Sequence, residues 1–214
     1  MCIRDRLELG GPDYGLWASA PDQVAYVLGR PLVATPGEQF AYDSGAFHLL
    51  SVALTRGCGP TSDVAAELLL GPLGIPSRDW ETDNQGFDNG SAGLVLTARE
   101  MLAVGNLVLD HGTVASTQLV SSTFVDAATS QQIATGDPAG MAPGYGYGWW
   151  VGETASGAAY AMAAGWGGQF IVVVPGAGAV IAATTSWRGL SEAVASQHFV
   201  QMGSVIRDDI VPLL

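Results

Sequence analysis

The stretch PGEQFAYDSGAFHLL, which covers residues 36–50, predicts a turn, a short extended segment and the start of a helix. Its opening Pro-Gly pair is a turn signal, because proline fixes its own φ angle and glycine tolerates the conformation that follows. Further along, Phe47, Leu50 and Leu54 are spaced as on one face of a helix, so that face is expected to be buried. Tyr42 is therefore expected on a rigid turn where the helix starts, a place from which a phenol can face a cleft.

Helices are predicted in the first two thirds of the chain and strands in the last third. Capping residues and apolar spacing predict further helices over residues 21–28, 61–70, 97–112, 122–129 and 191–206. Short apolar segments joined by glycine-rich turns predict antiparallel strands over residues 145–151, 158–162, 169–175 and 179–185. This order indicates an α+β fold, with a helical part over residues 7–142 and, over residues 143–214, a sheet part that ends in a helix.

Length and composition are those of one globular domain, and the charge argues against a nucleic-acid partner. The 214 residues are 48% hydrophobic and 13% charged. A formal net charge of -12 would repel phosphates, and the eight basic residues, all arginines, form no basic stripe. The most apolar run, residues 171–183, is interrupted by Pro175 and Gly176, which predicts a hairpin and not a membrane span.

No metal or other cofactor is expected. His48, His111 and His198 are scattered along the chain without the close spacing of metal ligands. Cys2 and Cys58 form neither a metal motif nor a disulfide framework.

The stretch around Tyr42 resembles the tyrosine signature of the serine β-lactamase-related family. This family includes class C β-lactamases, penicillin-binding proteins, family VIII carboxylesterases and 6-aminohexanoate-dimer hydrolases. Two further segments are similar to it: GLVLTAREMLAVGNLVLDHG, residues 93–112, resembles a scaffold helix, and residues 166–168 resemble the third signature in its esterase and amide-hydrolase form. The resemblance implies a β-lactamase/transpeptidase-like fold, closest to the carboxylesterases and the 6-aminohexanoate-dimer hydrolases.

The resemblance also implies acyl transfer on a small-molecule ester or amide through a serine ester intermediate. Tyr42 would be the catalytic tyrosine that moves the proton. Ser44 stands where the lactamases carry asparagine, a replacement that favours esters or linear amides over β-lactams. Trp166 would supply a backbone N–H to the oxyanion hole, and Gly167 and Gly168 would form a wall of the substrate site. The structural alternatives are a Tyr42 ring that is merely buried and a β-bulge with a packed Trp166 indole.

A long polar loop is expected over residues 76–93. Its segment from Trp80 to Gly86 resembles a W-x-x-D-x-Q-G segment near the substrate mouth of the related hydrolases, which would make Trp80 and Asp83 substrate-binding. The alternative is a surface loop whose Asp83 carboxylate faces solvent. Ser91, in the context NGSAG, comes near a nucleophile elbow, but asparagine replaces the first glycine and no buried strand precedes it.

The nucleophile signature of the family, Ser-x-x-Lys, has no counterpart here, since the chain contains no lysine. In the family this motif lies upstream of the tyrosine signature. We therefore expect an N-terminally truncated hydrolase, with residues 7–214 as the C-terminal part of a single domain, and we expect the fragment itself to be inactive. The first six residues, MCIRDR, resemble a translated sequencing adapter and are set aside. Both an extracytoplasmic and a cytoplasmic location are compatible with the sequence.

Two other classes of protein compete with the hydrolase. A non-catalytic binding protein would keep the cleft and recognise acyl ligands without turnover, and its gene would lack Ser-x-x-Lys upstream. A plain α+β scaffold without a retained function is disfavoured by the signatures at Tyr42 and Trp166.

Overall fold

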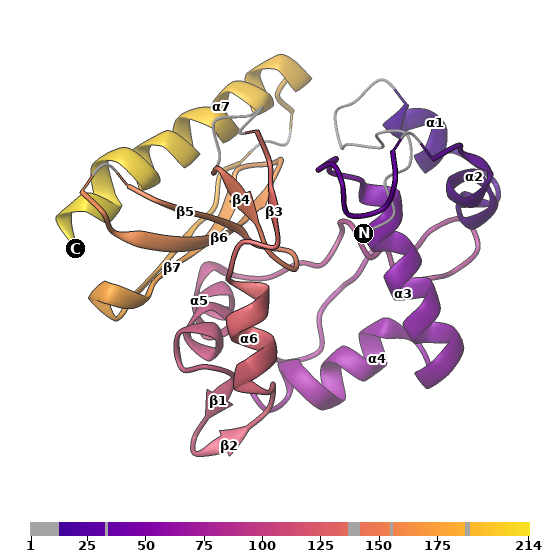
Figure 1. Cartoon of the computed structure of the whole chain (residues 1–214). Helices are drawn as coiled ribbons and strands as arrows, with labels where there is room; N and C mark the ends of the chain where they lie inside the picture. The colour runs from indigo at the N-terminus through magenta and orange to yellow at the C-terminus, as the bar shows by residue number, and fades with distance from the viewer. Residues whose placement is uncertain (1–12, 33, 137–141, 155, 187–188) are drawn as a thin grey trace. The chain divides into compact units, whose positions relative to one another are not determined.

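The computed structural model describes residues 13–32, 34–136, 142–154, 156–186 and 189–214. Their contacts divide the chain into two compact units, Met1–Leu96 and Thr97–Leu214. The first is coloured indigo to magenta in Figure 1, and the second continues from pink to yellow. The adapter-like sequence at residues 1–6 lies outside the described residues.

The described part of the first unit is helical. Its helices are α1 (Tyr14–Ala18), α2 (Gln23–Gly29), α3 (Ser44–Cys58) and α4 (Thr61–Ala65), and α4 continues as the π-helical turn η1 (Ala66–Leu70). Two of them begin at aspartate caps: Asp22 accepts from the Ala25 N–H at 2.7 Å, and Asp43 from the Ala46 N–H at 3.1 Å. These caps satisfy N–H groups that have no partner inside the helix, and the predicted helix starts are confirmed.

A small apolar cluster holds the first three helices together. Trp17 of α1 and Val27 of α2 are fully buried at its centre. The Trp17 indole N–H donates to the Gln23 carbonyl at 3.3 Å, and the ring lies edge-on to His48 of α3 with 5.7 Å between centroids. The side of α3 that carries His48 is therefore packed against α1 and α2.

The second unit contains an antiparallel sheet with helices on it. Its helices are α5 (Ala98–Leu109), α6 (Ser122–Ala128) and α7 (Glu192–Ser204), the last extended by η3 (Val205–Ile210) and η4 (Val211–Leu213). The sheet strands are β3 (Ile133–Ala134), β4 (Gly144–Tyr145), β5 (Trp150–Glu153), β6 (Ala159–Gly165), β7 (Gln169–Val174) and β8 (Ala179–Ala183), and a separate hairpin joins β1 (Thr113–Val114) to β2 (Thr117–Gln118). A short turn, η2 (Pro175–Ala177), links β7 to β8. The sheet order β3-β4-β5-β6-β7-β8 is a meander, so the α+β class is confirmed.

One predicted strand is wrong. Residues 145–151 do not form a single strand, because β4 and β5 are antiparallel neighbours with Tyr145 opposite Trp150. The chain reverses through Gly148, whose φ of +87° is open to glycine but strained for other residues. The sheet also begins earlier than residue 143, since β3 pairs with β4.

The two faces of the sheet are covered by different helices. Alternate residues of a strand point to opposite faces. Phe170 of β7 stacks on Phe199 of α7 with 5.4 Å between centroids, while Ile171, the next residue, lies against Gly105 of α5. Figure 1 shows α7 along one face of the sheet and α5 on the other. The helix α5 starts at the predicted capping box, in which Thr97 and Glu100 bond each other's backbone N–H.

A methyl group at Gly105 is expected to destabilise the second unit. Its Cβ would collide with Val180 Cγ1 and lie 2.9 Å from Ile171 Cγ2, both on stiff β-branched side chains of the sheet. We expect the overpacking in Gly105→Ala, about 1–3 kcal/mol, to exceed the helix-propensity gain of about 0.5–1 kcal/mol. The free energy of unfolding, measured by urea denaturation, should therefore fall. Gly57→Ala is the matched control, because Gly57 is exposed on α3 with no atom near its would-be Cβ, and it should stabilise slightly. Equal effects at both sites would contradict the close packing at Gly105.

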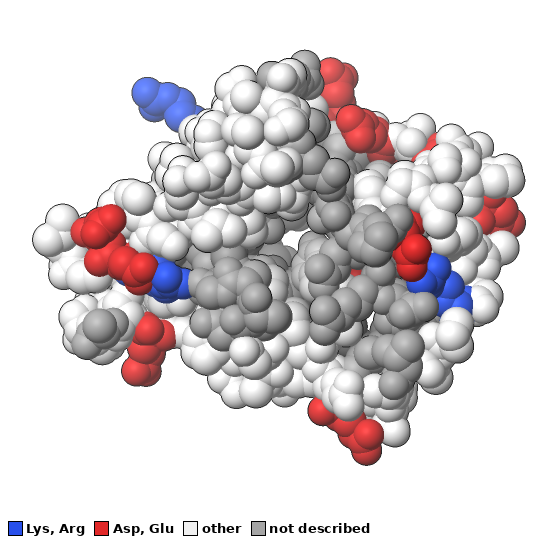
Figure 2. Space-filling view, turned by 90° about the horizontal axis from the view of Figure 1, so that it is seen from above, with Lys and Arg blue, Asp and Glu red and all other residues white. Residues whose placement is uncertain are grey.

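Acidic side chains outnumber basic ones, 20 to 8. Figure 2 shows acidic side chains in several places on the visible face, and the basic side chains that it draws lie apart from one another. Across the described residues, no helix combines the length and the hydropathy needed to cross a membrane.

Candidate active site

Tyr42 lies directly before the start of α3, as predicted. Its half-buried ring is tilted against the ring of Phe47, with 5.7 Å between centroids and 35° between planes. The next residue, Asp43, caps the helix through its carboxylate. The position of the phenol is therefore tied to the first turns of α3.

Ser44 and His48 lie on the same face of α3. They are four residues apart, a spacing that places two side chains one above the other on a helix. Both are buried, Ser44 with 2% and His48 with 0% of its surface exposed. A polar pair on the packed face of a helix needs polar partners, and that of His48 comes from a distant part of the chain.

Asp83 is the partner of His48. Its side chain is fully buried, and Oδ2 lies 2.9 Å from His48 Nε2. The other oxygen, Oδ1, accepts from the backbone N–H groups of Gln85 at 2.8 Å and Phe87 at 2.9 Å. The alternative of a solvent-facing Asp83 is therefore wrong. In the sequence His48 is one of three scattered histidines, and its pairing with Asp83 is not evident there. The prediction that the face of Phe47, Leu50 and Leu54 is buried is wrong, because Leu50 is 66% exposed and the buried side of α3 carries Ser44, His48 and Ser51. Polar residues on the packed side of a helix give no apolar pattern, so the sequence held no local signal for the pair.

The hydrogen bonds also assign the histidine proton. The Gly90 N–H points at His48 Nδ1 from 3.4 Å, so Nδ1 is the acceptor and Nε2 carries the proton that it donates to Asp83. Gly90 lies directly on α3. A Cβ there would collide with the Phe47 carbonyl oxygen and approach Ser51 Cβ at 2.9 Å.

The polar segment 80–93 is held in place by several other bonds. The Trp80 indole N–H donates to the Asn89 carbonyl at 2.9 Å, within the segment itself. The Ser51 hydroxyl of α3 donates to the Asp88 carbonyl at 2.6 Å. The Asn84 amide donates to the carbonyl of Ala20, in the connection between α1 and α2, at 2.9 Å. The segment is thus attached to the helices of the first unit, and the half-buried Trp80 links its two ends through the bond to Asn89.

Ser91 does not have the setting of a nucleophile. It lies in a turn of the segment, where its N–H and hydroxyl both donate to Asn89 Oδ1, at 3.0 and 2.8 Å. Nearby, burial raises the pKa of Tyr14, a hydrogen bond to Ser91 lowers it, and the Glu81 charge raises it further. The net pKa of Tyr14 is above its usual value, so this second phenol stays neutral at physiological pH.

In the second unit, Trp166, Gly167 and Gly168 form the turn between β6 and β7. The turn is closed by the Gly168 N–H, which donates to the Gly165 carbonyl at 2.8 Å. Gly168 has a φ of +80°, and a Cβ on it would collide with the Thr185 side chain, so glycine is required there. The Trp166 indole N–H donates to Ser196 Oγ of α7 at 3.1 Å. The indole is therefore anchored on α7, and the oxyanion role of the Trp166 backbone N–H stays a prediction.

The predicted site residues fall into two groups. The first unit contains Tyr42, Ser44, Trp80 and Asp83, and the second contains Trp166, Gly167 and Gly168. Within the first unit, one helix carries Tyr42 at its start and the partner of Asp83 one turn later. Within the second, one hairpin turn carries the other three residues.

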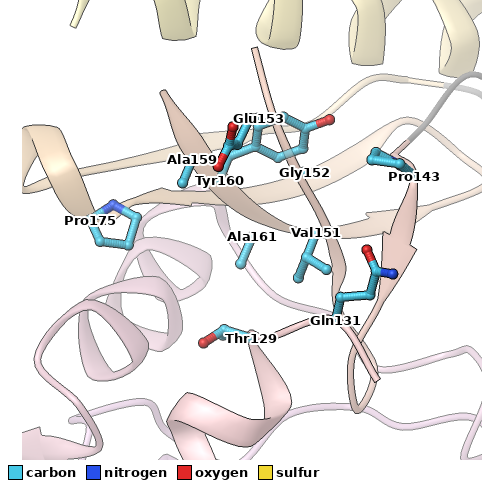
Figure 3. Close-up of a pocket in the computed structure, with 10 residues that line it drawn as sticks. All are labelled: Thr129, Gln131, Pro143, Val151, Gly152, Glu153, Ala159, Tyr160, Ala161 and Pro175. Atoms are coloured by element: carbon cyan, nitrogen blue, oxygen red, sulfur yellow. The ribbon is translucent and has the colours of Figure 1, made fainter. Parts of the chain in front are cut away.

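A shallow pocket of about 420 Å³ lies elsewhere in the second unit. Figure 3 shows its floor, made by small apolar side chains such as Val151 and Ala161, with Thr129 and Gln131 on one side and Pro175 on another. None of the predicted site residues lines it. Among the residues that the structure describes, no three His, Cys, Asp or Glu side chains are grouped to hold a metal ion.

A helical unit and a meander sheet flanked by α5 and α7 match solved structures of one fold class. A 6-aminohexanoate-dimer hydrolase from Bacillus anthracis is 21% identical with a TM-score of 0.62, and the match covers 86% of this chain and 49% of that one. A beta-lactamase from Bacteroides dorei is 20% identical with a TM-score of 0.64, covering 95% and 69%. An octameric penicillin-binding protein homologue from Pyrococcus abyssi is 17% identical with a TM-score of 0.64, covering 88% and 47%.

The family follows from the sequence. The beta-lactamase family profile matches residues 7–200, and the chain therefore belongs to the beta-lactamase family, as the resemblance implied. No curated protein sequence matches the chain. The chain spans about half the length of two of the three solved structures above.

Proposed function

We propose that this chain is part of a serine hydrolase that cleaves esters or linear amides of small molecules through an acyl-enzyme. The observation that carries the proposal is the position of Tyr42, which lies just before the capped start of α3 in a stretch that resembles the tyrosine signature of the family. The similarity to structures of a 6-aminohexanoate-dimer hydrolase and a beta-lactamase supports the reaction class.

In this proposal Tyr42 moves the proton between the serine nucleophile and the leaving group. An unperturbed tyrosine has a pKa of about 10, so it needs a neighbouring cation to act as a base at neutral pH. Ser44, in place of the lactamase asparagine, favours esters or linear amides. The Trp166 backbone N–H would stabilise the oxyanion, a donor of a kind typically worth about 3–4 kcal/mol of barrier. Gly167 and Gly168 would form a wall of the substrate site.

The nucleophile and the cation must come from outside these 214 residues if the mechanism is the family's. The chain has no lysine, and the Ser-x-x-Lys pair requires one. By themselves the 214 residues are not expected to turn over substrate. The same observation favours the second candidate, a binding protein that recognises acyl ligands without turnover.

The two candidates are separated by one experiment on the complete gene product. The gene is read upstream of residue 7 for a Ser-x-x-Lys codon pattern, and its product is assayed with p-nitrophenyl esters and with nitrocefin. The hydrolase predicts the motif, turnover of the esters and covalent labelling by a fluorophosphonate probe that is lost when the motif serine is changed to alanine. Absence of the motif, together with ester binding without turnover or labelling, would establish the binding protein instead.

A further inference from the structure

We infer that Asp83 and His48 form a positioning pair, which fixes the proposed catalytic tyrosine Tyr42 through the first turns of α3, and that Asp83 does not contact substrate. The role of Tyr42 in this inference rests on the proposed function. The pair itself rests on the geometry of the first unit.

Both oxygens of the Asp83 carboxylate accept hydrogen bonds from groups of the protein itself. Oδ2 accepts from His48, and Oδ1 accepts from two backbone N–H groups of its own segment. Its side chain has no exposed surface. A carboxylate enclosed in this way acts on a reaction only through the groups that it holds.

His48 is the point where segment 80–93 is attached to α3. Asp83 holds Nε2, the Gly90 N–H meets Nδ1, and the Trp17 ring packs against the imidazole edge-on. A ring held at both nitrogens and on its edge cannot turn without breaking one of these contacts. His48 therefore fixes the helical turn from which it projects.

The same turn supports Tyr42. Phe47 comes directly before His48, its ring is the surface against which Tyr42 is tilted, and its carbonyl is in close contact with Gly90. If segment 80–93 moved away from α3, Phe47 would lose its contact with Gly90. The ring against which Tyr42 packs would then no longer be held in a fixed position. The coupling thus runs through adjacent packed groups over one and a half turns of helix.

The direct test uses the 214-residue chain labelled with 3-fluorotyrosine. The chain has six tyrosines, and the Tyr42→Phe variant identifies the Tyr42 signal in the ¹⁹F NMR spectrum. We expect Asp83→Asn and His48→Leu to shift or broaden that signal. His48→Gln, whose amide can still donate to Asp83, should bring it back toward the wild-type position. Asp79→Asn, at an exposed carboxylate of the adjoining loop, should leave it unchanged.

Other tyrosines show whether a variant is folded. If His48→Leu unfolds the first unit, the Tyr26 signal will move to its random-coil position as well. The milder variant Asp83→Asn then tests whether the pair positions Tyr42. A Tyr42 signal that stays in place in folded Asp83→Asn would overturn the inference, whether or not the protein is a hydrolase.

Kinetics of the complete gene product give the second test. A positioning role predicts that Asp83→Asn lowers kcat about tenfold or more, with KM changed less than about twofold, equally for short and long acyl p-nitrophenyl esters. In a Tyr42→Phe background the loss should largely disappear, because the two residues act as one unit. A raised KM, additive with Tyr42→Phe, would show a substrate contact and overturn the inference. An inactive wild-type protein would contradict the proposed function alone, and the fluorine result would then decide on the pair.

Discussion

Replacing Tyr42 by phenylalanine in the complete gene product is expected to lower kcat for p-nitrophenyl esters by about 10²–10⁴-fold, the usual contribution of a positioned acid or base. The change removes one oxygen and keeps the ring, so the packing on Phe47 at the start of α3 should persist. KM should change little, because the phenol takes part in proton transfer in the transition state and does not bind the ester in the ground state. Initial rates over a range of ester concentrations separate the two constants.

The control for this prediction is Tyr147→Phe. Tyr147 is 54% exposed, and its ring stacks on Phe124, a contact that phenylalanine retains. This variant should keep wild-type kinetics. A Tyr42→Phe enzyme with nearly full kcat would show that another group moves the proton, and the proposed mechanism would then be wrong.

The second large effect is expected on stability, from His48→Leu in the 214-residue chain. The substitution leaves the Asp83 carboxylate buried without one of its three donors. Removing one partner of a buried hydrogen bond typically lowers the free energy of unfolding by about 1–3 kcal/mol, and by more where the remaining group is charged. Urea unfolding followed by tryptophan fluorescence measures the loss, because Trp17 packs directly on His48.

The chain supplies its own matched control in a second histidine pair. His111 Nδ1 lies 2.9 Å from Asp126, the same separation as in the buried pair, but both side chains are more than half exposed. Solvent screening makes such a pair worth less than about 1 kcal/mol. His111→Leu should therefore change the free energy of unfolding little. If both leucine variants unfold at the same urea concentration, burial is not what makes the Asp83 pair important.

Features that depend on neighbouring residues could be predicted from the sequence. The start of α3 and the capping box of α5 need only residues three positions apart, and both are confirmed. The strand prediction over residues 145–151 failed because apolar content and β propensity do not reveal a reversal at Gly148.

The candidate site likewise contains one feature that neighbouring residues determine and others that depend on distant contacts. The tyrosine signature is local, and it correctly placed Tyr42 at the start of a helix. The pair of His48 and Asp83 joins residues 35 positions apart, and no local pattern records a tertiary contact of this kind. Sequence spacing likewise could not show that the Trp166 indole is bonded to α7.

The meander order of the sheet has a consequence for how the second unit folds. Each strand from β3 to β8 pairs only with its neighbours along the chain, so most strand pairings close short loops. Proteins rich in such local contacts fold faster than those that must first join distant segments. The exception is α5, which precedes the whole sheet and packs on its last two strands. We expect the hairpins from β5 to β8 to form early and the docking of α5 to come late, so that changes at Gly105 speed unfolding while leaving the folding rate almost unaltered.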